Sequence, residues 1–494
     1  MTATSIKLED RLTDVRSTLQ AAEQSHILGF FDELDDAGKD TLLTQIEGID
    51  WPEVQRLAGS HVLNKPEFSM PDNIEPAPFF ARQPDREGGS DAQALYTDAR
   101  KRGEQLIAEG KVAAFTVAGG QGTRLGWDGP KGSFPATPIR KLPLFGCFAE
   151  YIIKAQEKWN TTIPWYIMTS PANDADTRAF LEKNSYFSLD PANVMLFPQA
   201  MMPAIDMQTG KVLLASKGEL ALSPNGHGGS LKALFTSGAI ADMKKRGVEQ
   251  ISYTQVDNPA VKMVDPLFIG LHDLDDAQMS SKMLPKAFPK EKLGNFCLVD
   301  GRVSVIEYSD LPDELAEQRT PEGELRFKAG SIAIHMIRVD FVESLNSGKD
   351  GFGLPFHRAE KKVPFVNASG TEVSPGSPNA VKLETFVFDA LPLCEDSIIY
   401  ETDRVEEFAP VKNADAPEGE EPAVDSPASS KLLQIERAAR WLEQRGVVVV
   451  RGGDEGQGDF EGVIEICNVT AIEPDDLVHS GLPDAIGPET ELVV

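Results

Sequence analysis

Residues 117–131, VAGGQGTRLGWDGPK, set the strongest limit on how this sequence can fold. They include the end of the run AAFTV, whose apolar character predicts a short buried strand. Because Gly119, Gly120 and Gly122 lack side chains, the backbone N–H groups of the turn after this strand can approach a phosphate closely. The segment therefore predicts a sheet in which one strand ends in a phosphate-binding turn.

Two familiar phosphate-binding motifs do not fit this segment. A P-loop requires GxxxxGK followed by Ser or Thr, which is absent here. A dinucleotide fingerprint requires GxGxxG, but Leu125 occupies the third glycine position, which disfavours a nicotinamide-dependent dehydrogenase. The segment instead reads GGxGTRLG followed by Pro130 and Lys131, with Arg124 as a second cation. Two cations beside a glycine turn suit a polyanionic ligand.

The composition excludes several other classes of protein. The 494 residues carry a formal net charge of −29, and such a surface repels nucleic acid, although a few cations in a cleft can still bind a small polyanion. No run approaches the roughly 20 apolar residues of a membrane-spanning helix, and the N-terminus lacks the pattern of a secretory signal. The four cysteines form no CxxC pair, which disfavours a zinc site or disulfide framework and favours a reducing, cytoplasmic location.

Apolar periodicity predicts the coarse order of elements. The runs VAAFTV, WYIMTS, VMLF and ISYTQVDN are typical of short buried strands, and AEYIIKAQEKW is typical of a helix. Residues 230–247 predict one continuous helix with Ser230 as its N-cap and Gly247 at its C-terminal end. Strands that alternate with helices favour an α/β fold with a mixed, mainly parallel sheet.

Through these motifs the sequence resembles a known family. Residues 117–131 are similar to the signature of sugar-nucleotide pyrophosphorylases, and most of the chain resembles the eukaryotic-type UDP-N-acetylglucosamine pyrophosphorylases of the UDP-sugar pyrophosphorylase family. The resemblance implies a uridylyltransferase that forms UDP-N-acetylglucosamine and pyrophosphate from UTP and N-acetylglucosamine 1-phosphate, with Mg²⁺. We expect a monomer or weak homo-oligomer without nucleic acid or membrane partners. The further matching segments are residues 197–203, 224–229, 255–258, 286–307, 327–333, 360–364, 379–388 and 410–415.

The pattern of elements along the chain, together with the resemblance over most of it, predicts the organisation of the chain. We expect a helical N-terminal region over residues 1–100 and a central Rossmann-like nucleotidyltransferase domain over 101–405, which binds UTP and the sugar phosphate. A small C-terminal α+β domain over 406–494 follows. Within it, residues 414–430 are rich in Pro, Ala, Ser and acids, which predicts a mobile acidic surface loop.

The matched segments imply a role for each of a set of residues. The cations at the reacting phosphates are Arg124, Lys131 and Lys412. The magnesium ligand is Asp257. The nucleotide contacts are Ala118, Gly119, Gly120, Gly122, Thr123, Gln199, Gly226 and His227. The contacts to the sugar and its phosphate are Gly294, Glu307, Tyr308, Ser331, Lys382, Phe386 and Phe388.

Elementary chemistry agrees with several of these roles. The amide of Gln199 offers both a donor and an acceptor, which the edge of a pyrimidine requires. Asp257 follows a predicted parallel strand, where a carboxylate is well placed to hold a metal at the ligand edge of a sheet. Glu307 can accept two hydrogen bonds from sugar hydroxyls.

Two departures from the family pattern leave the sugar open. His227 stands where the acetylglucosamine enzymes often carry Asn and UDP-glucose-type relatives carry His. Ser331 stands where the acetylglucosamine enzymes usually carry an Asn that reaches the sugar. Glucose 1-phosphate, galactose 1-phosphate or a broad range of sugar 1-phosphates is therefore an alternative acceptor. A non-catalytic UDP-sugar-binding sensor is an alternative of another class, which would keep the uracil and sugar contacts without the triphosphate cations.

Overall fold

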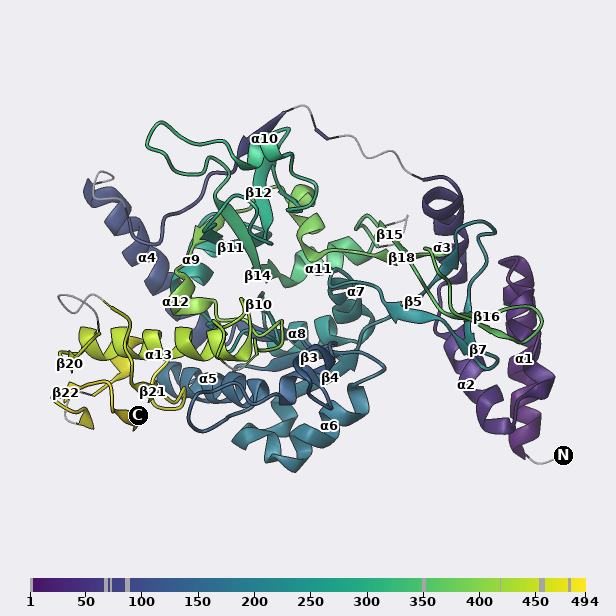
Figure 1. Cartoon of the computed structure of the whole chain (residues 1–494), viewed down its shortest axis with the longest axis horizontal. Coiled ribbons are helices and arrows are strands. Elements are labelled where there is room, and N and C mark those ends of the chain that lie inside the picture. The colour runs from purple at the N-terminus through teal and green to yellow at the C-terminus, as the bar shows by residue number, and fades with distance from the viewer. Residues whose placement is uncertain are drawn as a thin grey trace. The chain divides into compact units, whose positions relative to one another are not determined.

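The computed structural model describes residues 3–65, 70–71, 73–84, 89–348, 352–417, 419–452, 458–478 and 481–494 (Figure 1). The contacts divide the chain into two compact units, each built from three segments. The smaller unit comprises Met1–Asp72, Gln199–Leu231 and Leu354–Val387, and the larger comprises Asn73–Pro198, Lys232–Gly353 and Phe388–Val494. The domain boundaries expected at residues 100 and 405 stay predictions, because a grouping of contacts does not test whether a segment folds alone.

In the smaller unit, helices from the N-terminal region share a core with short strands from later in the chain. Its helices are α1 (Ala3–Ala21), α2 (Asp36–Glu47), α3 (Trp51–Leu57) and the π-helix η3 (Ala58–Leu63). Its strands are β5 (Met201–Pro203), β6 (Ile205–Asp206), β7 (Leu214–Ser216), β8 (Glu219–Leu220), β9 (Leu222–Pro224), β15 (His357–Lys361), β16 (Phe365–Val366), β17 (Glu372–Val373) and β18 (Ala380–Glu384). Val381 and Leu383 of β18 pack with the helices, so Lys382 between them lies on the opposite face.

The larger unit contains a ten-stranded mixed sheet, in which seven strands follow the order β1-β12-β14-β10-β2-β3-β4. Of the other three strands, β11 pairs with β14, β13 pairs with β12, and β19 pairs with β11. Strands β10, β2, β3 and β4 are parallel, whereas β14 is antiparallel to β10. The strands predicted from the sequence are present, and the predicted α/β class is confirmed. The bounds are β1 (Ile74–Pro76), β2 (Val112–Val117), β3 (Trp165–Thr169), β4 (Val194–Pro198), β10 (Gln250–Gln255), β11 (Met279–Pro285), β12 (Gly294–Val299), β13 (Arg302–Ile306), β14 (Ala329–Arg338) and β19 (Ile399–Glu401).

Helices cover both faces of this sheet. Trp165 of β3 packs its ring edge-on against Phe145 and Phe148 of α5 (Leu144–Trp159), whereas the Tyr166 hydroxyl donates to Asp242 of α8 (Ala239–Arg246) at 2.7 Å. Because successive strand residues point to opposite faces, α5 and α8 lie on opposite sides of the sheet. The remaining helices are α4 (Gly89–Ala108), α6 (Asp174–Lys183), α9 (Pro266–Leu274), α10 (Asp313–Ala316), α11 (Val339–Asn346), α12 (Arg404–Glu407) and α13 (Pro427–Gln444).

The continuous helix predicted for residues 230–247 is wrong. The structure has two helices, α7 (Gly229–Thr236) and α8, and Gly238 between them adopts a left-handed φ of +84°. A glycine in this conformation ends a helix, so the apolar stripe that runs through both helices concealed the break. Ser230 is also not an N-cap, because it lies inside α7 and its hydroxyl donates to the His227 carbonyl at 2.6 Å. Gly247 ends α8 as predicted.

The C-terminal part has its own small core beneath α13. Ser426 caps this helix in a capping box with Ser429, so the helix begins at Pro427 and the last four residues of the predicted loop 414–430 are helical. The strands that follow are β20 (Val448–Val449), β21 (Val463–Glu465), β22 (Ala485–Ile486) and β23 (Glu491–Val493).

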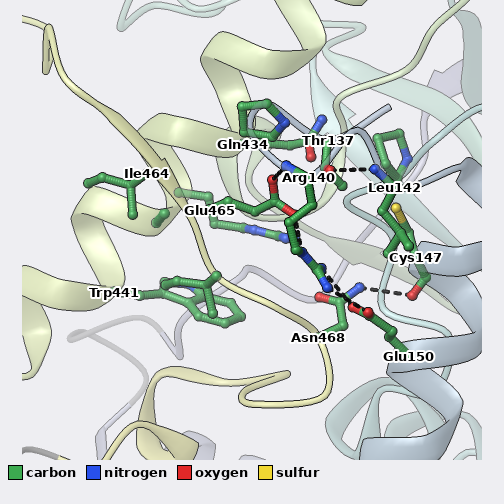
Figure 2. A pocket seen from close by; sticks show the side chains of 15 residues that line it. Thr137, Arg140, Leu142, Cys147, Glu150, Gln434, Trp441, Ile464, Glu465 and Asn468 are labelled. Atoms are coloured by element: carbon green, nitrogen blue, oxygen red, sulfur yellow. Dashed lines mark hydrogen bonds and ion pairs between the residues drawn. The ribbon is translucent and has the colours of Figure 1, made fainter. Parts of the chain in front are cut away.

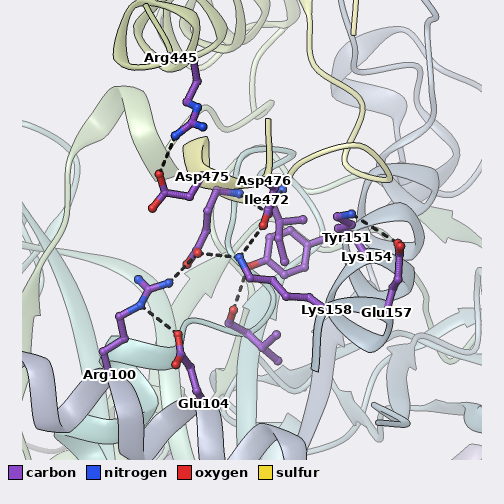
Figure 3. Close-up of polar contacts among 12 residues, drawn as sticks. Arg100, Glu104, Tyr151, Lys154, Glu157, Lys158, Arg445, Ile472, Asp475 and Asp476 are labelled. Atoms are coloured by element: carbon purple, nitrogen blue, oxygen red, sulfur yellow. Dashed lines mark hydrogen bonds and ion pairs between the residues drawn. The ribbon is translucent and has the colours of Figure 1, made fainter. Parts of the chain in front are cut away.

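Ion pairs join this C-terminal part to helices α4 and α5 (Figure 3). Lys158 of α5 bonds the carboxylates of Glu473 and Asp476 at 2.9 and 2.6 Å, and Arg100 of α4 bonds Glu473 at 2.6 Å. The Tyr151 hydroxyl of α5 donates to the Val264 carbonyl beside them. The C-terminal part therefore packs on the rest of the larger unit through partly buried charges, whose attraction water screens less than at an open surface.

Among the described residues, no helix is long and apolar enough to cross a membrane. All four cysteines are buried free thiols.

Candidate active site

The glycine turn and Asp257 meet at one edge of the sheet. Strands β2 and β10 are parallel neighbours with Val117 opposite Gln255, so the segments that follow both strands leave the sheet on the same side. The Lys131 ammonium then lies 3.5 Å from the Asp257 carboxylate. The structure thus brings together the cation and the carboxylate that the sequence predicts for phosphate and metal.

Hydrogen bonds within the turn hold its shape. The N–H of Gly122 donates to the Gly129 carbonyl at 2.9 Å, and the N–H of Lys131 donates to the Gly120 carbonyl at 3.1 Å. The Asn173 side-chain amide donates to the carbonyls of Ala118 and Gly120 at 2.9 and 3.1 Å. Sequence reasoning missed Asn173, although an Asn that follows a predicted strand and precedes a helix is a typical side chain for holding a loop.

The glycines of this turn serve different purposes. At Gly120, no described heavy atom lies within 4 Å of the position that a Cβ would take, so the turn is open to an approaching group there. At Gly122 a Cβ would lie 2.8 Å from the Trp127 side chain, which is a packing requirement. Gly126 adopts a φ of +67° and ends the 3₁₀ turn Thr123–Leu125. The exposed Arg124 lies on that turn, whereas Ala118 is buried and its N–H donates to the Met168 carbonyl.

Lys412 belongs to a segment that is tied to Asp257. The N–H of Val411 donates to the Asp257 carbonyl at 2.8 Å, which places the next residue, Lys412, beside the carboxylate-bearing loop. The Lys412 ammonium lies 3.5 Å from the Asp425 carboxylate and 5.1 Å from the centre of the Phe408 ring. Lys412 is therefore already held by an acid and an aromatic ring.

Three of the predicted sugar contacts also lie together. Gly294 of β12 is opposite Ser331 of β14. A Cβ at Gly294 would lie 2.6 Å from the Val305 side chain, so packing requires glycine here. The same position is 3.6 Å from the Glu307 carboxylate and 3.8 Å from the Ser331 Cβ, so these two side chains lie close together. Tyr308 follows Glu307 and is 44% exposed. Ala333, just beyond Ser331, has a φ of +55° where the register between β11 and β14 shifts.

In the smaller unit, the two matched segments around His227 and Phe386 pack on each other. Gly226 has a φ of +83°, and a Cβ there would lie 2.3 Å from the Thr385 carbonyl oxygen, so this position requires glycine. The Val387 N–H donates to Nδ1 of His227 at 3.1 Å, and the His227 ring stacks on Phe386 at 5.3 Å. Burial, aided by the nearby His357, lowers the pKa of His227 to about 4, so its imidazole is neutral near pH 7.

The remaining predicted residues are distributed over both units. Gln199 is buried at the start of the second segment of the smaller unit, and Lys382 lines a hollow of about 430 Å³ in that unit together with Glu219 and Val363. Phe388 is buried in the 3₁₀ helix Val387–Leu393.

A buried charge cluster next to Asp257 was missed from the sequence. Lys282 is fully buried and bonds Asp265 and Glu407, each at 2.6 Å. Asn258 donates to the Glu407 carbonyl at 2.7 Å and accepts from the Ala409 N–H at 3.0 Å. A single Lys within the apolar run MSSKMLP gives no sequence signal of this role, because its partners lie far away along the chain.

The fold and this site define an α/β nucleotidyltransferase: a mixed sheet whose first parallel strand ends in a cationic glycine turn beside a carboxylate. The chain belongs to the UTP–glucose-1-phosphate uridylyltransferase family, whose model matches residues 80–446.

Individual relatives agree with this membership. The chain is 36% identical to the Homo sapiens UDP-N-acetylhexosamine pyrophosphorylase-like protein 1 over 88% of this chain and 86% of that one. It is 30% identical to the Saccharomyces cerevisiae UDP-N-acetylglucosamine pyrophosphorylase over 89% and 93% of the two chains. The crystal structure of the Trypanosoma brucei UDP-N-acetylglucosamine pyrophosphorylase with an inhibitor superimposes with a TM-score of 0.78 at 25% identity, covering 98% of each chain. The family resemblance found in the sequence is confirmed.

Proposed function

We propose that this chain transfers the uridylyl group of UTP to N-acetylglucosamine 1-phosphate and so forms UDP-N-acetylglucosamine and pyrophosphate. The single observation that carries the proposal is the meeting of Lys131 and Asp257 at the open glycine turn. The relatives align with most of the chain at 30 to 36% identity. Their names support uridine as the nucleoside and an acetylated amino sugar as the acceptor.

The reaction needs positioning more than covalent help from the protein. An oxygen of the sugar phosphate attacks the α-phosphorus of UTP, and the bond from that phosphorus to the bridging oxygen breaks in line as pyrophosphate leaves. The attacking oxygen is already anionic near pH 7, so no general base is required. Lys131 and Arg124 neutralise the triphosphate, while Lys412 holds the sugar phosphate. The role in sugar-phosphate binding that the family resemblance implies for Lys382 stays a prediction.

The residues present fit a magnesium ion. Mg²⁺ is typically held by one or two carboxylates and completed by substrate phosphates and water, and Asp257 supplies a carboxylate whose side chain is 14% exposed beside the glycine turn. When bound, the ion would neutralise the phosphate oxygens. Asp257 would hold the ion, and Lys131 would share the same phosphates.

The sugar is selected, in this proposal, by the region around Gly294, Glu307 and Ser331. The Glu307 carboxylate, which lies near Gly294, can accept hydrogen bonds from two sugar hydroxyls. The short Ser331 side chain can reach an acetamido group directly or through water. Glucose 1-phosphate and galactose 1-phosphate are the competing acceptors. The buried free thiols are consistent with work in a reducing compartment such as the cytoplasm.

A panel of sugar 1-phosphates tests the proposal. Pyrophosphate release would be measured with UTP and with other nucleoside triphosphates, with and without Mg²⁺. We expect the highest kcat/KM for UTP with N-acetylglucosamine 1-phosphate and no turnover without the metal. Turnover with glucose or galactose 1-phosphate alone would reassign the sugar. UDP-sugar binding without any pyrophosphate release would make the chain a sensor and overturn the proposal.

A further inference from the structure

One face of helix α13 carries three hydrogen-bond donors that reach backbone carbonyls rather than side chains. Ser430, Gln434 and Arg437 are spaced four and three residues apart, so they lie on the same side of the helix. The Ser430 hydroxyl is fully buried. A buried face with polar side chains is unusual for a helix, since such groups are placed there only where each finds a partner.

The three donors reach three different loops. Ser430 donates to the Ala409 carbonyl at 2.5 Å, and Gln434 donates to the Ala136 carbonyl at 3.1 Å. Arg437 donates to the Ala260 carbonyl at 3.0 Å, with the Trp441 ring against its guanidinium. Because each acceptor is a main-chain oxygen, the helix fixes the path of these loops whatever side chains they carry.

Each of these carbonyls lies close along the chain to a proposed site residue. Ala136 comes five residues after Lys131, Ala260 comes three residues after Asp257, and Ala409 comes three residues before Lys412. One helix face therefore holds the three segments that carry the cations and the carboxylate of the site.

The start of the same helix holds Lys412 directly. The carbonyl of Asp425, next to the N-cap of α13, accepts the N–H groups of Lys412 and Asn413 at 2.6 and 3.0 Å. The Asp425 carboxylate also lies 3.5 Å from the Lys412 ammonium. Both the backbone and the side chain of Lys412 are thus held by Asp425, the residue just before the N-cap of α13.

The chain beyond α13 also binds the loop that contains Ala136, through the side chain of Glu465 (Figure 2). The Glu465 carboxylate accepts the backbone N–H groups of Ile139 and Arg140, both at 2.8 Å, and the Arg140 guanidinium at 2.6 Å. Burial alone would raise the pKa of Glu465, but these donors outweigh it and the pKa lies below its ordinary value. Glu150 of α5 holds the other side of the same guanidinium.

We propose that α13 is the positioning element of the active site, and that its Ser430–Gln434–Arg437 face sets the distances between Lys131, Asp257 and Lys412. This inference rests on the proposed function, because those three residues need a common frame only if they act on the same phosphates. Ser430, Gln434 and Arg437 are positioning residues, since each acts through a carbonyl of a loop and touches no substrate.

The test uses the full chain and a matched pair of variants on one helix. Gln434→Leu removes the amide from the carbonyl of Ala136, and Gln444→Leu makes the same chemical change at an exposed position at the end of α13. We expect Gln434→Leu to lower kcat about tenfold while KM for both substrates stays within about twofold, as a misplaced charged group would do. Backbone hydrogen exchange should become faster in residues 134–142 and unchanged in the control.

A conservative variant at Arg437 tests whether activity returns when a donor is kept at this position. Arg437→Met should lower kcat in the same way and speed exchange in residues 257–262, whereas Arg437→Lys keeps a charged donor and should recover a large part of kcat. A fall in the thermal midpoint with exchange increased over the whole larger unit would show a merely structural helix and overturn the inference.

The outcomes separate this inference from the proposed function. If the wild-type chain transfers no uridylyl group, the function fails, while the local exchange response still reports whether α13 holds the loops. If the wild type is active and Gln434→Leu matches Gln444→Leu in both kcat and exchange, the positioning role is refuted although the function stands. A raised KM with unchanged kcat would equally refute it.

Discussion

The Lys131 ammonium lies 3.5 Å from the Asp257 carboxylate, although 126 residues separate the two along the chain. The pairing follows from the parallel register of β2 and β10, which puts the ends of both strands at one edge. Without substrate the two charges neutralise each other. A triphosphate with its metal can replace this pair with better partners, since Lys131 would gain phosphate oxygens and Asp257 would gain a cation.

Removal of the ammonium should therefore cost turnover. We expect Lys131→Met to lower kcat about 10²-fold, because a charge aimed at the reacting phosphates is lost, and Arg124→Ala to have a similar effect. Lys183→Met, a change of an exposed lysine at the end of α6, is the matched control and should keep the wild-type kcat. Steady-state pyrophosphate release measures all three. Wild-type rates in both Lys131→Met and Arg124→Ala would remove the basis of the assignment.

A feature of this site can be predicted from the sequence when its residues are close together along the chain. The glycine turn, its preceding strand and the carboxylate after β10 are short-range patterns, so the sequence predicts them, while the roles of the site residues stay predictions. The break at Gly238 was missed because an apolar stripe continues through both helices. The charge cluster around Lys282 could not be predicted, because the residues that pair with Lys282 are distant in sequence. The role proposed for α13 could not be predicted either, because every residue has a backbone carbonyl and its type does not show which carbonyl accepts a bond.

Asp257 should be required for the metal rather than for the fold. Asp257→Asn keeps the size of the side chain and leaves the backbone carbonyl that accepts from Val411 unchanged, so we expect normal folding. We expect kcat to fall about 10²-fold and the Mg²⁺ concentration for half-maximal rate to rise, because a neutral amide binds the ion weakly. A titration of rate against Mg²⁺ measures both. An unchanged Mg²⁺ dependence would place the metal on other groups.

Two alanine substitutions in the glycine turn should separate binding from stability. At Gly120 a methyl group meets open space, so Gly120→Ala should keep the thermal midpoint and raise KM for UTP by obstructing the approach of a phosphate. At Gly122 a methyl group would lie 2.8 Å from Trp127, so Gly122→Ala should destabilise the chain by about 1–3 kcal/mol. Thermal unfolding and KM measured on both variants check this contrast. The reverse pattern would mean that the turn binds its ligand elsewhere.

His227 should make the chain less stable in acid. Burial lowers its pKa to about 4, while the unfolded chain has the ordinary value, so between these two the unfolded state binds more protons and stability falls as the pH falls. The loss from this group should be about 2 kcal/mol near pH 5 and near zero above pH 7. His227→Asn removes the titrating group, so its stability relative to wild type should improve by that amount on acidification. Denaturant unfolding at the two pH values measures the difference, and a pH-independent difference would show that His227 is not protonated on unfolding.

Ser331 should control the choice of sugar, because it is the residue of β14 opposite Gly294, close to the Glu307 carboxylate. Ser331→Asn adds an amide that can both donate to and accept from an acetamido group, where the hydroxyl of Ser331 reaches less far. We expect the ratio of kcat/KM for N-acetylglucosamine 1-phosphate over glucose 1-phosphate to rise up to about tenfold, because one hydrogen bond contributes a net of about 0.5–1.5 kcal/mol. Ser304→Asn, an equal change on β13, which pairs with β12 rather than with β14, is the control and should leave the ratio unchanged. Competition between the two sugar phosphates in one reaction measures the ratio directly. A ratio that moves equally in both variants would show that the acceptor does not bind against β14, and the sugar region would then have to be sought on another strand.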